Sequence, residues 1–362
     1  MKKVFPLPIY VITCMILKNG ISLRGLRNLP PWMIKALVFE PLRWVELTYN
    51  SKIKDHVILK DPIFILGFYR SGTSFMHEFI TQDDRLGYHT NFQMVLPEIM
   101  LCSERFLSPF FDFICRVLNI QDPVHRIRMS FKFPGEEDAA MTTGFNIRGA
   151  HWGYFFPKIM MSHIQKYVLF DNIKNSEIRG WKNDFVFLLK KISLANKGKQ
   201  LVLKSPPNTA RVKLLLSLFP NAKFIFIHRN PYDVYASNKR FMKLTYKIYA
   251  MGGTKNINTT DHILDTYTQY MNKYLSEKNL IPDGQLIEIR YEDFIKRPME
   301  SMNNIYTALN LNEIKYCEKK MMSYINSRKG YKKLEHNLPP DEKSIVTSRL
   351  ETFIKQWNYQ LM

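Results

Sequence analysis

The sequence lacks several features that would place it quickly in a structural class. Its 362 residues contain only four cysteines, and none of them stands in a CxxC pair. This scattered usage gives no support to zinc-ribbon or thioredoxin-like folds, and it is typical of reduced cysteines in a reducing compartment, so we expect a cytoplasmic protein. Internal repeats and low-complexity tracts are also absent from the sequence, which argues against solenoids and long disordered tails.

Acidic residues are scarce relative to basic ones. There are 32 Asp and Glu against 52 Lys and Arg, which gives a formal net charge of +20. A field of this sign attracts polyanions: nucleic acid, an anionic membrane, or a multiply phosphorylated small molecule. Hydrophobic residues make up 46% and aromatic residues 14% of the chain, so disorder is excluded and a large core is possible.

The sequence has no apolar run long enough to span a bilayer as a helix. The longest one near the N-terminus, residues 4–17, is shorter than the roughly 20 residues that a spanning helix needs. Pro6 and Pro8 interrupt it and no small-x-small cleavage site follows, which argues against a signal peptide. A second aromatic and basic segment covers residues 30–44. Two interpretations stay open: helices packed on the main domain, or a peripheral contact with a membrane surface.

Short apolar runs alternate with helical patterns along the rest of the chain. We expect strands at residues 62–67, 200–203, 223–227 and 285–289, and helices at 73–80, 176–196, 208–219 and 231–245. This alternation predicts an α/β protein: a P-loop-like three-layer fold with a central parallel sheet and a large helical insertion. The expected division is an N-terminal helical segment, 1–58, and a main domain, 59–362, with the insertion at about 94–196. Ligands of such sheets bind beyond the C-terminal ends of the strands.

The first of these strand ends carries a glycine-bounded loop. Gly67 and Gly72 have the Gly-x-x-x-x-Gly spacing of a P-loop, which cradles an anion with backbone amides and a helix N-terminus. Thr73 stands where a P-loop has its lysine, and Arg70 supplies the positive charge instead. No expected strand ends in an aspartate that could hold magnesium, which argues against a nucleotide-dependent kinase. Further anion-binding candidates are the hydroxyl groups of Ser71, Thr73 and Ser74.

Two other strand ends carry basic residues. The run 223–227 continues into His228 and Arg229, and Ser237 follows Arg229 eight residues later, with a helix start between them at which Asp233 is a cap candidate. An arginine and a serine placed in this way can both reach one phosphate. Lys204 leaves the end of the run 200–203, an unfavourable place for a charge without a ligand. After it, Asn208 is expected to cap the next helix.

These motifs, in this order, resemble those of the sulfotransferases that use 3′-phosphoadenosine-5′-phosphosulfate (PAPS). The segment 67–74 is similar to the phosphosulfate loop of the arginine-bearing branch, which includes tyrosylprotein sulfotransferases and bacterial families. Arg229 and Ser237 resemble its 3′-phosphate site, and Lys204 its sulfuryl-contacting lysine. A Tyr-Glu-Asp sequence at 291–293, also common in the family, is interpreted as a strand end and helix cap. The resemblance covers about residues 60–295 and implies PAPS as donor, without a metal.

The resemblance leaves the catalytic base open. Tyrosylprotein sulfotransferases have a glutamate shortly after the loop helix, but residues 88–93 contain no carboxylate. His89 is near the place where the histidine of the cytosolic branch could serve. Glu136 and Glu137 resemble a Pro-x-Glu motif of bacterial sulfotransferases, including those that act on menaquinone-type lipids; the alternative is that they are ordinary residues of a helix N-terminus. His151, beside a tryptophan, is interpreted as a packing residue.

The acceptor side is less informative. Aromatic residues in the insertion suit core packing, or an apolar tunnel for a lipid acceptor. A basic segment at 327–333 is either a lid over the donor or a solvated loop. The expected activity is therefore sulfuryl transfer from PAPS to a hydroxyl, with a lipid as one acceptor class. The alternatives are a nucleotide-dependent kinase and a nucleic-acid-binding protein; the charge prompts the latter, but no recognised motif supports it.

Overall fold

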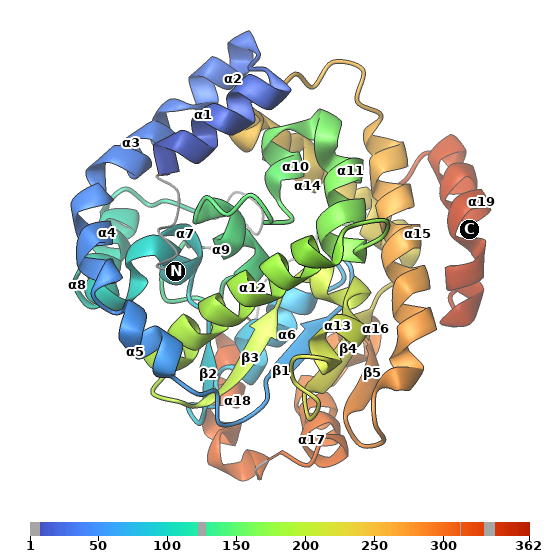
Figure 1. Ribbon diagram of the computed structural model, residues 1–362. Coiled ribbons are helices and arrows are strands. Elements are labelled where there is room, and N and C mark those ends of the chain that lie inside the picture. The colour runs from blue at the N-terminus through green and yellow to red at the C-terminus, as the bar shows by residue number, and fades with distance from the viewer. Residues whose placement is uncertain (1–7, 122–127, 312, 329–336) are drawn as a thin grey trace. The chain divides into compact units, whose positions relative to one another are not determined.

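The computed structural model describes residues 8–121, 128–311, 313–328 and 337–362 (Figure 1). The residues before Pro8 and most of the basic segment 327–333 lie outside the described residues. The chain divides into two compact units. Unit 1 contains Met1–Val57, His89–Ala195 and Phe241–Asn258, and unit 2 contains Ile58–Tyr88, Asn196–Arg240 and Thr259–Met362.

Unit 1 is helical over its described residues. Its α-helices are α1 (Pro8–Asn19), α2 (Leu23–Asn28), α3 (Pro30–Val38), α4 (Glu40–Leu47), α5 (Asn50–Asp55), α7 (Asn91–Val95), α8 (Met100–Val117), α9 (Glu137–Thr143), α10 (Trp152–Phe155), α11 (Met160–Ile164) and α12 (Asn175–Ala195). Short 3-10 helices cover Pro97–Ile99 and Pro157–Ile159, and a π-helix covers Gln165–Leu169.

Unit 2 contains the sheet and the helices that alternate with its strands. The elements are β1 (Ile63–Leu66), α6 (Thr73–Ile80), β2 (Leu86–Tyr88), β3 (Gln200–Lys204), α13 (Val212–Leu216), β4 (Lys223–His228), α15 (Thr259–Glu277), β5 (Leu286–Arg290), α16 (Tyr291–Lys296), α17 (Pro298–Ala308), α18 (Glu318–Ser327) and α19 (Pro340–Gln356). Short 3-10 helices cover Pro206–Ala210, Lys278–Leu280 and Ile314–Tyr316. The helix α14 (Pro231–Tyr249) begins in unit 2 and ends in unit 1.

The sheet is parallel, with the strand order β2-β3-β1-β4-β5. The prediction of an α/β fold around a parallel sheet is therefore confirmed, and the four expected strands are present. The sequence did not indicate β2, because its three residues Leu-Gly-Tyr form no apolar run. The order places β1 between β3 and β4, so the three strand ends that carry the predicted motifs are neighbours.

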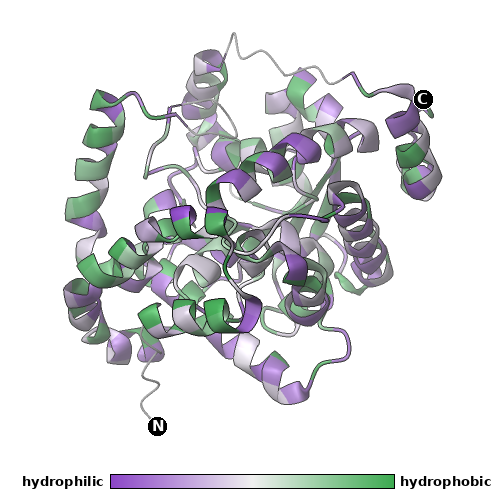
Figure 2. Ribbon diagram, turned by 90° about the horizontal axis from the view of Figure 1, so that it is seen from above, coloured by the Kyte–Doolittle hydropathy of each residue, from purple (hydrophilic) through white to green (hydrophobic). Residues whose placement is uncertain are grey.

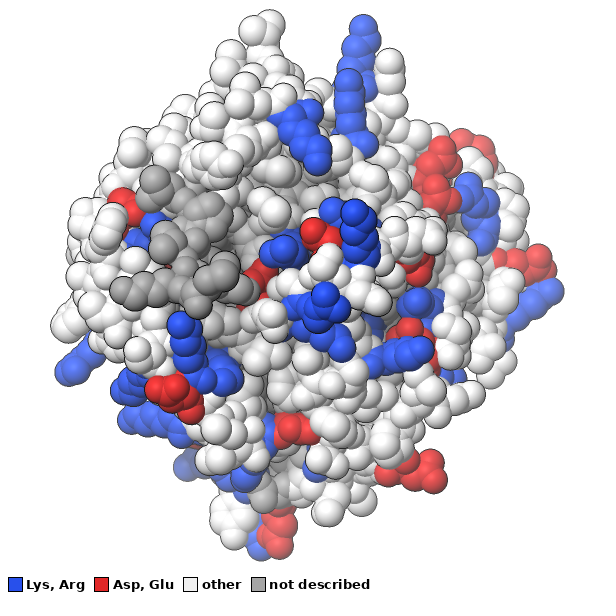
Figure 3. Space-filling model, in the orientation of Figure 1, with Lys and Arg blue, Asp and Glu red and all other residues white. Residues whose placement is uncertain are grey.

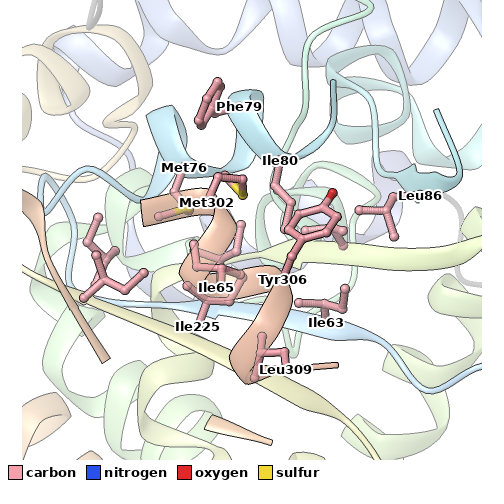
Figure 4. Packing of buried hydrophobic residues seen from close by; sticks show 14 of the residues in the cluster. Ile63, Ile65, Met76, Phe79, Ile80, Leu86, Ile225, Met302, Tyr306 and Leu309 are labelled. Atoms are coloured by element: carbon pink, nitrogen blue, oxygen red, sulfur yellow. The ribbon is translucent and has the colours of Figure 1, made fainter. Parts of the chain in front are cut away.

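Alternate residues of the strands pack on two different helical layers of unit 2. Ile63 and Ile65 of β1 lie in a buried cluster with Met76 of α6 and with Met302 and Tyr306 of α17 (Figure 4). On the other side, Phe226 of β4 stacks on Tyr274 of α15 with ring centroids 3.9 Å apart, and Phe64 of β1 stacks on Phe224. A strand covered on both faces needs a continuous apolar run, and β1 has one, with the sequence Ile-Phe-Ile-Leu.

One expected helix is wrong in its start. The sequence predicted a helix over 208–219 with Asn208 as its cap, but residues 206–210 form a 3-10 turn and α13 begins at Val212. Two consecutive prolines, Pro206 and Pro207, cannot donate backbone hydrogen bonds and favour the tighter turn. The Asn208 side chain is fully buried and accepts a hydrogen bond from Arg211 Nη1 at 3.3 Å.

The N-terminal helices of unit 1 pack on its aromatic insertion. Val11 and Ile12 of α1 are buried in a cluster with Trp152 and Phe155 of α10, and Trp32 of α3 packs edge-on against Phe155 at 4.9 Å. Pro30 and Pro31 occupy the first turn of α3, where their missing N–H groups cost nothing. Among the described residues, no helix is both long enough and apolar enough to cross a bilayer.

Candidate functional site

The glycine-bounded loop connects β1 to α6 and depends on both of its glycines. Gly67 has φ of +144° and Gly72 has φ of +100°, conformations that strain any residue with a Cβ. A Cβ on Gly72 would also lie 2.3 Å from Cδ2 of Tyr291, so the space is closed as well. The loop therefore needs glycine at both ends, as the spacing predicted.

Four consecutive carbonyl groups of this loop are held by side chains or by the loop itself. The bonds are Thr209 Oγ1 to Gly67 O (3.1 Å), Ser71 Oγ to Phe68 O (2.7 Å), Asn238 Nδ2 to Tyr69 O (2.8 Å) and Arg229 Nη1 to Arg70 O (3.2 Å). A loop fixed in this way keeps one backbone shape, and α6 begins directly after it with its N-terminus at the loop. Such an arrangement can bind an anion with little reorganisation.

Arg70 lies at the turn of the loop in an unusual conformation. Its φ is +69°, in the left-handed region that non-glycine residues seldom adopt. Its Nε donates a hydrogen bond to Ser237 Oγ of α14 at 3.1 Å. The structure thus brings together two residues that the sequence assigned to different ends of the donor. Strained backbone at such a place is common where a side chain must be aimed at a ligand.

Lys204 reaches the same loop from β3. The lysine is buried and donates a hydrogen bond to Ser74 Oγ of α6 at 3.3 Å. Since β3 is the neighbour of β1, the end of one strand delivers the lysine beside the loop that follows the other. A buried ammonium group at a strand end, next to a helix N-terminus, can stabilise negative charge on a bound group.

Arg229 leaves the end of β4 on the other side of β1. It is largely buried, forms an ion pair with Asp233 at 2.9 Å and lies over the ring of Tyr291 at 4.7 Å. Its buried Nε finds no hydrogen-bond partner within the part of the chain that the structure describes. A buried arginine that pairs with one carboxylate fits a phosphate, because phosphate oxygens can take the place of the carboxylate oxygens.

The Tyr-Glu-Asp segment supports this arginine. Glu292 accepts hydrogen bonds from the backbone N–H of Asn230 at 3.0 Å and from Tyr359 Oη at 2.9 Å. It therefore fixes the turn between Arg229 and α14, and Tyr291 provides the ring beneath the guanidinium. These contacts are structural, since they hold backbone and side chains of the protein.

The sequence reasoning missed three residues that shape the loop. The Thr209 hydroxyl accepts a hydrogen bond from the backbone N–H of Gly67 and donates one to the Gly67 carbonyl. The Asn238 side chain donates to the Tyr69 carbonyl, and the Tyr291 ring closes the space at Gly72. The only available signal was position: Thr209 and Asn238 follow closely after the predicted residues Lys204 and Ser237. Their role depends on the order of the strands, which no local pattern gives.

The predicted acceptor-side residues lie in unit 1, where the structure brings them together. Residues 89–92 run antiparallel to residues 131–135, with the backbone N–H of Gly135 donating to His89 O at 2.6 Å and that of Asn91 to Phe133 O at 2.7 Å. Glu136 occupies the N-cap position of α9, and Glu137, which is fully buried, opens its first turn. His89, Glu136 and Glu137 thus belong to one cluster.

Burial shifts the pKa of the histidine and that of a carboxylate in this cluster in opposite directions. Burial lowers the pKa of His89 to about 3, and neither ring nitrogen has a hydrogen-bond partner in normal geometry among the described residues. A third carboxylate, not indicated by the sequence, is Glu104 of α8. Burial raises its pKa, while hydrogen bonds from Thr90 (2.5 Å) and Gln93 (2.7 Å) oppose that shift. Glu104 fixes the start of α7, next to His89.

The described residues contain no group of three or more His, Cys, Asp or Glu side chains placed to hold a metal ion. The charge at the sheet edge comes instead from Arg70, Lys204 and Arg229.

Comparisons with known proteins agree with this geometry. Residues 62–314, more than half of the chain, match the model of the sulfotransferase family. A curated relative, the omega-hydroxy-beta-dihydromenaquinone-9 sulfotransferase Stf3 of Mycobacterium tuberculosis, is 26% identical over 316 residues, which are 87% of this chain and 80% of the relative.

Solved structures share the fold. Sulfotransferase STF9 from Mycobacterium avium superposes with a TM-score of 0.71 at 16% identity, covering 100% of this chain and 99% of that one. Sulfotransferase STF1 from Mycobacterium tuberculosis gives a TM-score of 0.68 at 17% identity, covering 95% and 91%. With the family match over the loop, the lysine and the arginine, the chain belongs to the sulfotransferase family and is a sulfotransferase.

Proposed function

We propose that the protein transfers the sulfuryl group of PAPS to a hydroxyl group on a lipid or another apolar molecule, at the membrane surface of the cytoplasm. The observation that carries the donor assignment is the convergence of Arg70, Lys204, Arg229 and Ser237 on one loop beyond three adjacent strands. It offers separate sites for two anionic groups of one nucleotide.

The 5′-phosphosulfate is proposed to bind the loop 67–74. The hydroxyl groups of Ser71, Thr73 and Ser74 and the N-terminus of α6 lie there, and both glycines allow a close approach of the backbone. The 3′-phosphate is proposed to bind Arg229 and Ser237, displacing the Asp233 carboxylate from the guanidinium. The site fits such a donor because it presents two cationic side chains that each contact a hydroxyl group, Lys204 at the end of β3 and Arg70 in the loop after β1.

The proposed reaction is an in-line displacement at sulfur. The acceptor oxygen forms a bond to sulfur while the bond from sulfur to the bridging oxygen breaks, and adenosine 3′,5′-bisphosphate leaves with the electron pair. Lys204 and Arg70 stabilise the charge that develops on the bridging oxygen, which is where fixed cations contribute most. The acceptor hydroxyl loses its proton to a base.

We propose a carboxylate of the pair Glu136 and Glu137 as this base, in preference to His89. A histidine whose pKa is about 3 has little tendency to take a proton near neutrality. Glu137 is fully buried in the first turn of α9, and Glu136 precedes it at the N-cap position. Substitution of Glu137 by Gln should abolish turnover while adenosine 3′,5′-bisphosphate still binds; unchanged turnover in both Glu137→Gln and Glu136→Gln would exclude this pair.

The proposed acceptor class rests on the relative and on the composition of unit 1. The curated relative is named for a menaquinone whose terminal group is a hydroxyl. In unit 1, aromatic side chains such as Trp152, Phe155 and Phe156 form a buried apolar cluster, next to helices that expose further apolar residues. A hydroxyl on an apolar molecule would suit such surroundings.

The donor assignment is tested by ligand stabilisation. Adenosine 3′,5′-bisphosphate should raise the melting temperature in the presence of EDTA, because no metal takes part in its binding. ATP with magnesium serves as the comparison. Equal stabilisation by ATP–magnesium, with no response to the bisphosphate, would refute the proposal and favour a kinase.

A further inference from the structure

The helix α8 of unit 1 exposes an apolar stripe that the proposed chemistry does not use. Phe106, Phe110, Phe113 and Val117 are 69%, 55%, 59% and 64% exposed. Their spacing of four, three and four residues places them on one face of the helix. Figure 2 shows α8 as the long, largely hydrophobic helix at the left edge of the molecule.

A second apolar face of the same helix is already covered. Leu107 and Phe111 of α8 pack against a buried cluster of Phe92, Leu96 and Ile99. The outward stripe is therefore not needed to hold the helix in place. Exposed apolar surface of this kind, contiguous along a helix, marks an interaction site more often than an accident of packing.

The charges of α8 are sorted between its two faces. Its acidic residues point to the protein: Glu104 accepts hydrogen bonds from Thr90 and Gln93, and Asp112 accepts one from the backbone N–H of Phe131 at 2.7 Å. Its arginines, Arg105 and Arg116, are exposed and lie on one flank of the stripe, about three helical turns apart. The outward face is thus apolar and cationic.

The neighbouring N-terminal helices show the same sorting. The sequence has no acidic residue before Glu40, and within residues 8–47 both carboxylates are paired, Glu40 with Arg43 and Glu46 with Lys191. Most exposed side chains there are basic or apolar, including Lys18, Arg24, Arg27, Leu17, Leu23, Leu37 and Trp44. In the view of Figure 3, no acidic side chain appears over α1 and α2.

The helices that carry these two surfaces are in contact within unit 1. The Glu46 carboxylate of α4 accepts hydrogen bonds from the backbone N–H groups of Leu101 (3.1 Å) and Cys102 (2.8 Å) at the start of α8. Trp44 and Val45, on the same helix as Glu46, are exposed. α4, which exposes apolar side chains, therefore packs beside the start of the helix that carries the stripe.

We propose that α8 is a docking helix for an anionic lipid bilayer, into which Phe106, Phe110, Phe113 and Val117 insert while Arg105 and Arg116 contact the headgroups. An aromatic stripe with basic residues along its flank is the pattern of helices that lie in the membrane interface. The absence of outward carboxylates on α8, among the residues that the structure describes, makes its charge complementary to anionic lipid. This inference deepens the proposed function, because docking would bring the enzyme to a lipid acceptor. Only this purpose of docking rests on the proposed lipid-acceptor function.

The test is cosedimentation of the full-length protein with vesicles of phosphatidylcholine and phosphatidylglycerol, compared with phosphatidylcholine alone. Each single substitution Phe106→Ser, Phe110→Ser or Phe113→Ser should weaken the partition coefficient about tenfold, since each removes one inserted ring. Arg105→Gln with Arg116→Gln should remove most of the preference for the anionic vesicles. Raised salt should weaken the wild type and leave that double variant little changed.

A matched control lies in unit 2. Tyr316→Ser with Met322→Ser removes exposed apolar side chains, 72% and 43% exposed, from elements outside this surface, and should leave vesicle binding unchanged. All variants should keep wild-type stabilisation by adenosine 3′,5′-bisphosphate, which shows that they fold. Wild-type vesicle binding by a triple variant that combines Phe106→Ser, Phe110→Ser and Phe113→Ser would overturn the proposal. So would a change of oligomeric state in that variant, which would assign the stripe to a second copy of the chain.

The outcomes for docking and for the proposed function are separable. Vesicle binding that depends on α8, in a protein that does not respond to the bisphosphate, would refute the donor assignment and leave docking intact. A protein that responds to the bisphosphate but ignores vesicles would refute docking alone.

Discussion

Replacement of Arg229 by alanine probes the proposed 3′-phosphate site most directly. The side chain makes three contacts in the structure: an ion pair with Asp233 (2.9 Å), a hydrogen bond to Arg70 O (3.2 Å) and a stack on Tyr291 (4.7 Å). The first would be exchanged for phosphate when the donor binds. The other two hold the arginine in place.

The magnitude follows from the exchanged contact. A hydrogen bond to a charged group contributes about 1.5–3 kcal/mol, so adenosine 3′,5′-bisphosphate should bind Arg229→Ala roughly tenfold to 150-fold more weakly. The Asp233 carboxylate, left without its partner, would repel the phosphate and place the loss toward the upper end. Asp233→Asn should bind the bisphosphate at least as tightly as the wild type, because no carboxylate competes for the arginine.

The assay compares two ligands by calorimetry. Adenosine 5′-phosphate lacks the 3′-phosphate, so Arg229→Ala should weaken it far less than the bisphosphate, and the difference isolates the contact to that phosphate. Arg297→Ala is the control, an exposed arginine of unit 2 paired with Glu300. Equal weakening of both ligands would show that Arg229 supports the loop but does not bind the 3′-phosphate.

Three further predictions concern other parts of the chain. Lys204→Ala should lower turnover more than donor affinity, since the charge of Lys204 matters most when the bridging oxygen becomes negative. Single-turnover kinetics with a separately measured Kd test this, and a larger effect on Kd than on turnover would contradict it. Leu17→Ser with Leu23→Ser, at positions 81% and 89% exposed, should weaken vesicle binding and transfer to a lipid acceptor but not bisphosphate binding; full lipid activity would argue against a membrane role for α1 and α2. Burial opposes ionisation of Asp83, but hydrogen bonds from Arg85 and Tyr306 prevail and lower its pKa below 3.8. The ionised form therefore stabilises the fold above that pH and ceases to do so as the pH falls below it. Urea unfolding should show Asp83→Asn less stable by about 1.5–3 kcal/mol at pH 7, with a smaller gap at pH 3, and a gap independent of pH would contradict this.

Local patterns gave much of unit 2. The helix predicted over 73–80 has those bounds in the structure, and the run 223–227 lies within β4. Both depend on short-range signals, a strand that runs into glycine and a continuous apolar run. The start of α13 was missed because two prolines, followed by a buried Asn208, impose a turn that hydrophobic periodicity does not register.

Contacts between distant segments could not be predicted. Thr209 and Gly67 are 142 residues apart, and their pairing follows from the neighbouring positions of β1 and β3 in the sheet. On the acceptor side, the sequence offered His89 and Glu136 as separate alternatives. The antiparallel pairing of residues 89–92 with 131–135 places them in one cluster. The outward stripe of α8 was equally hidden, since composition does not tell which aromatic residues remain exposed.

The left-handed backbone of Arg70 has a consequence for the kinetics of donor binding. The bonds to the carbonyl groups of residues 67–70 come from side chains of the protein itself, and they hold Arg70 at φ of +69°. Folding therefore sets the shape of the loop before the donor arrives. The observed association rate should then rise linearly with donor concentration, without a plateau from a slow rearrangement of the loop. Release of the bisphosphate, for which the loop stays equally well shaped, is the step that this rigidity would slow.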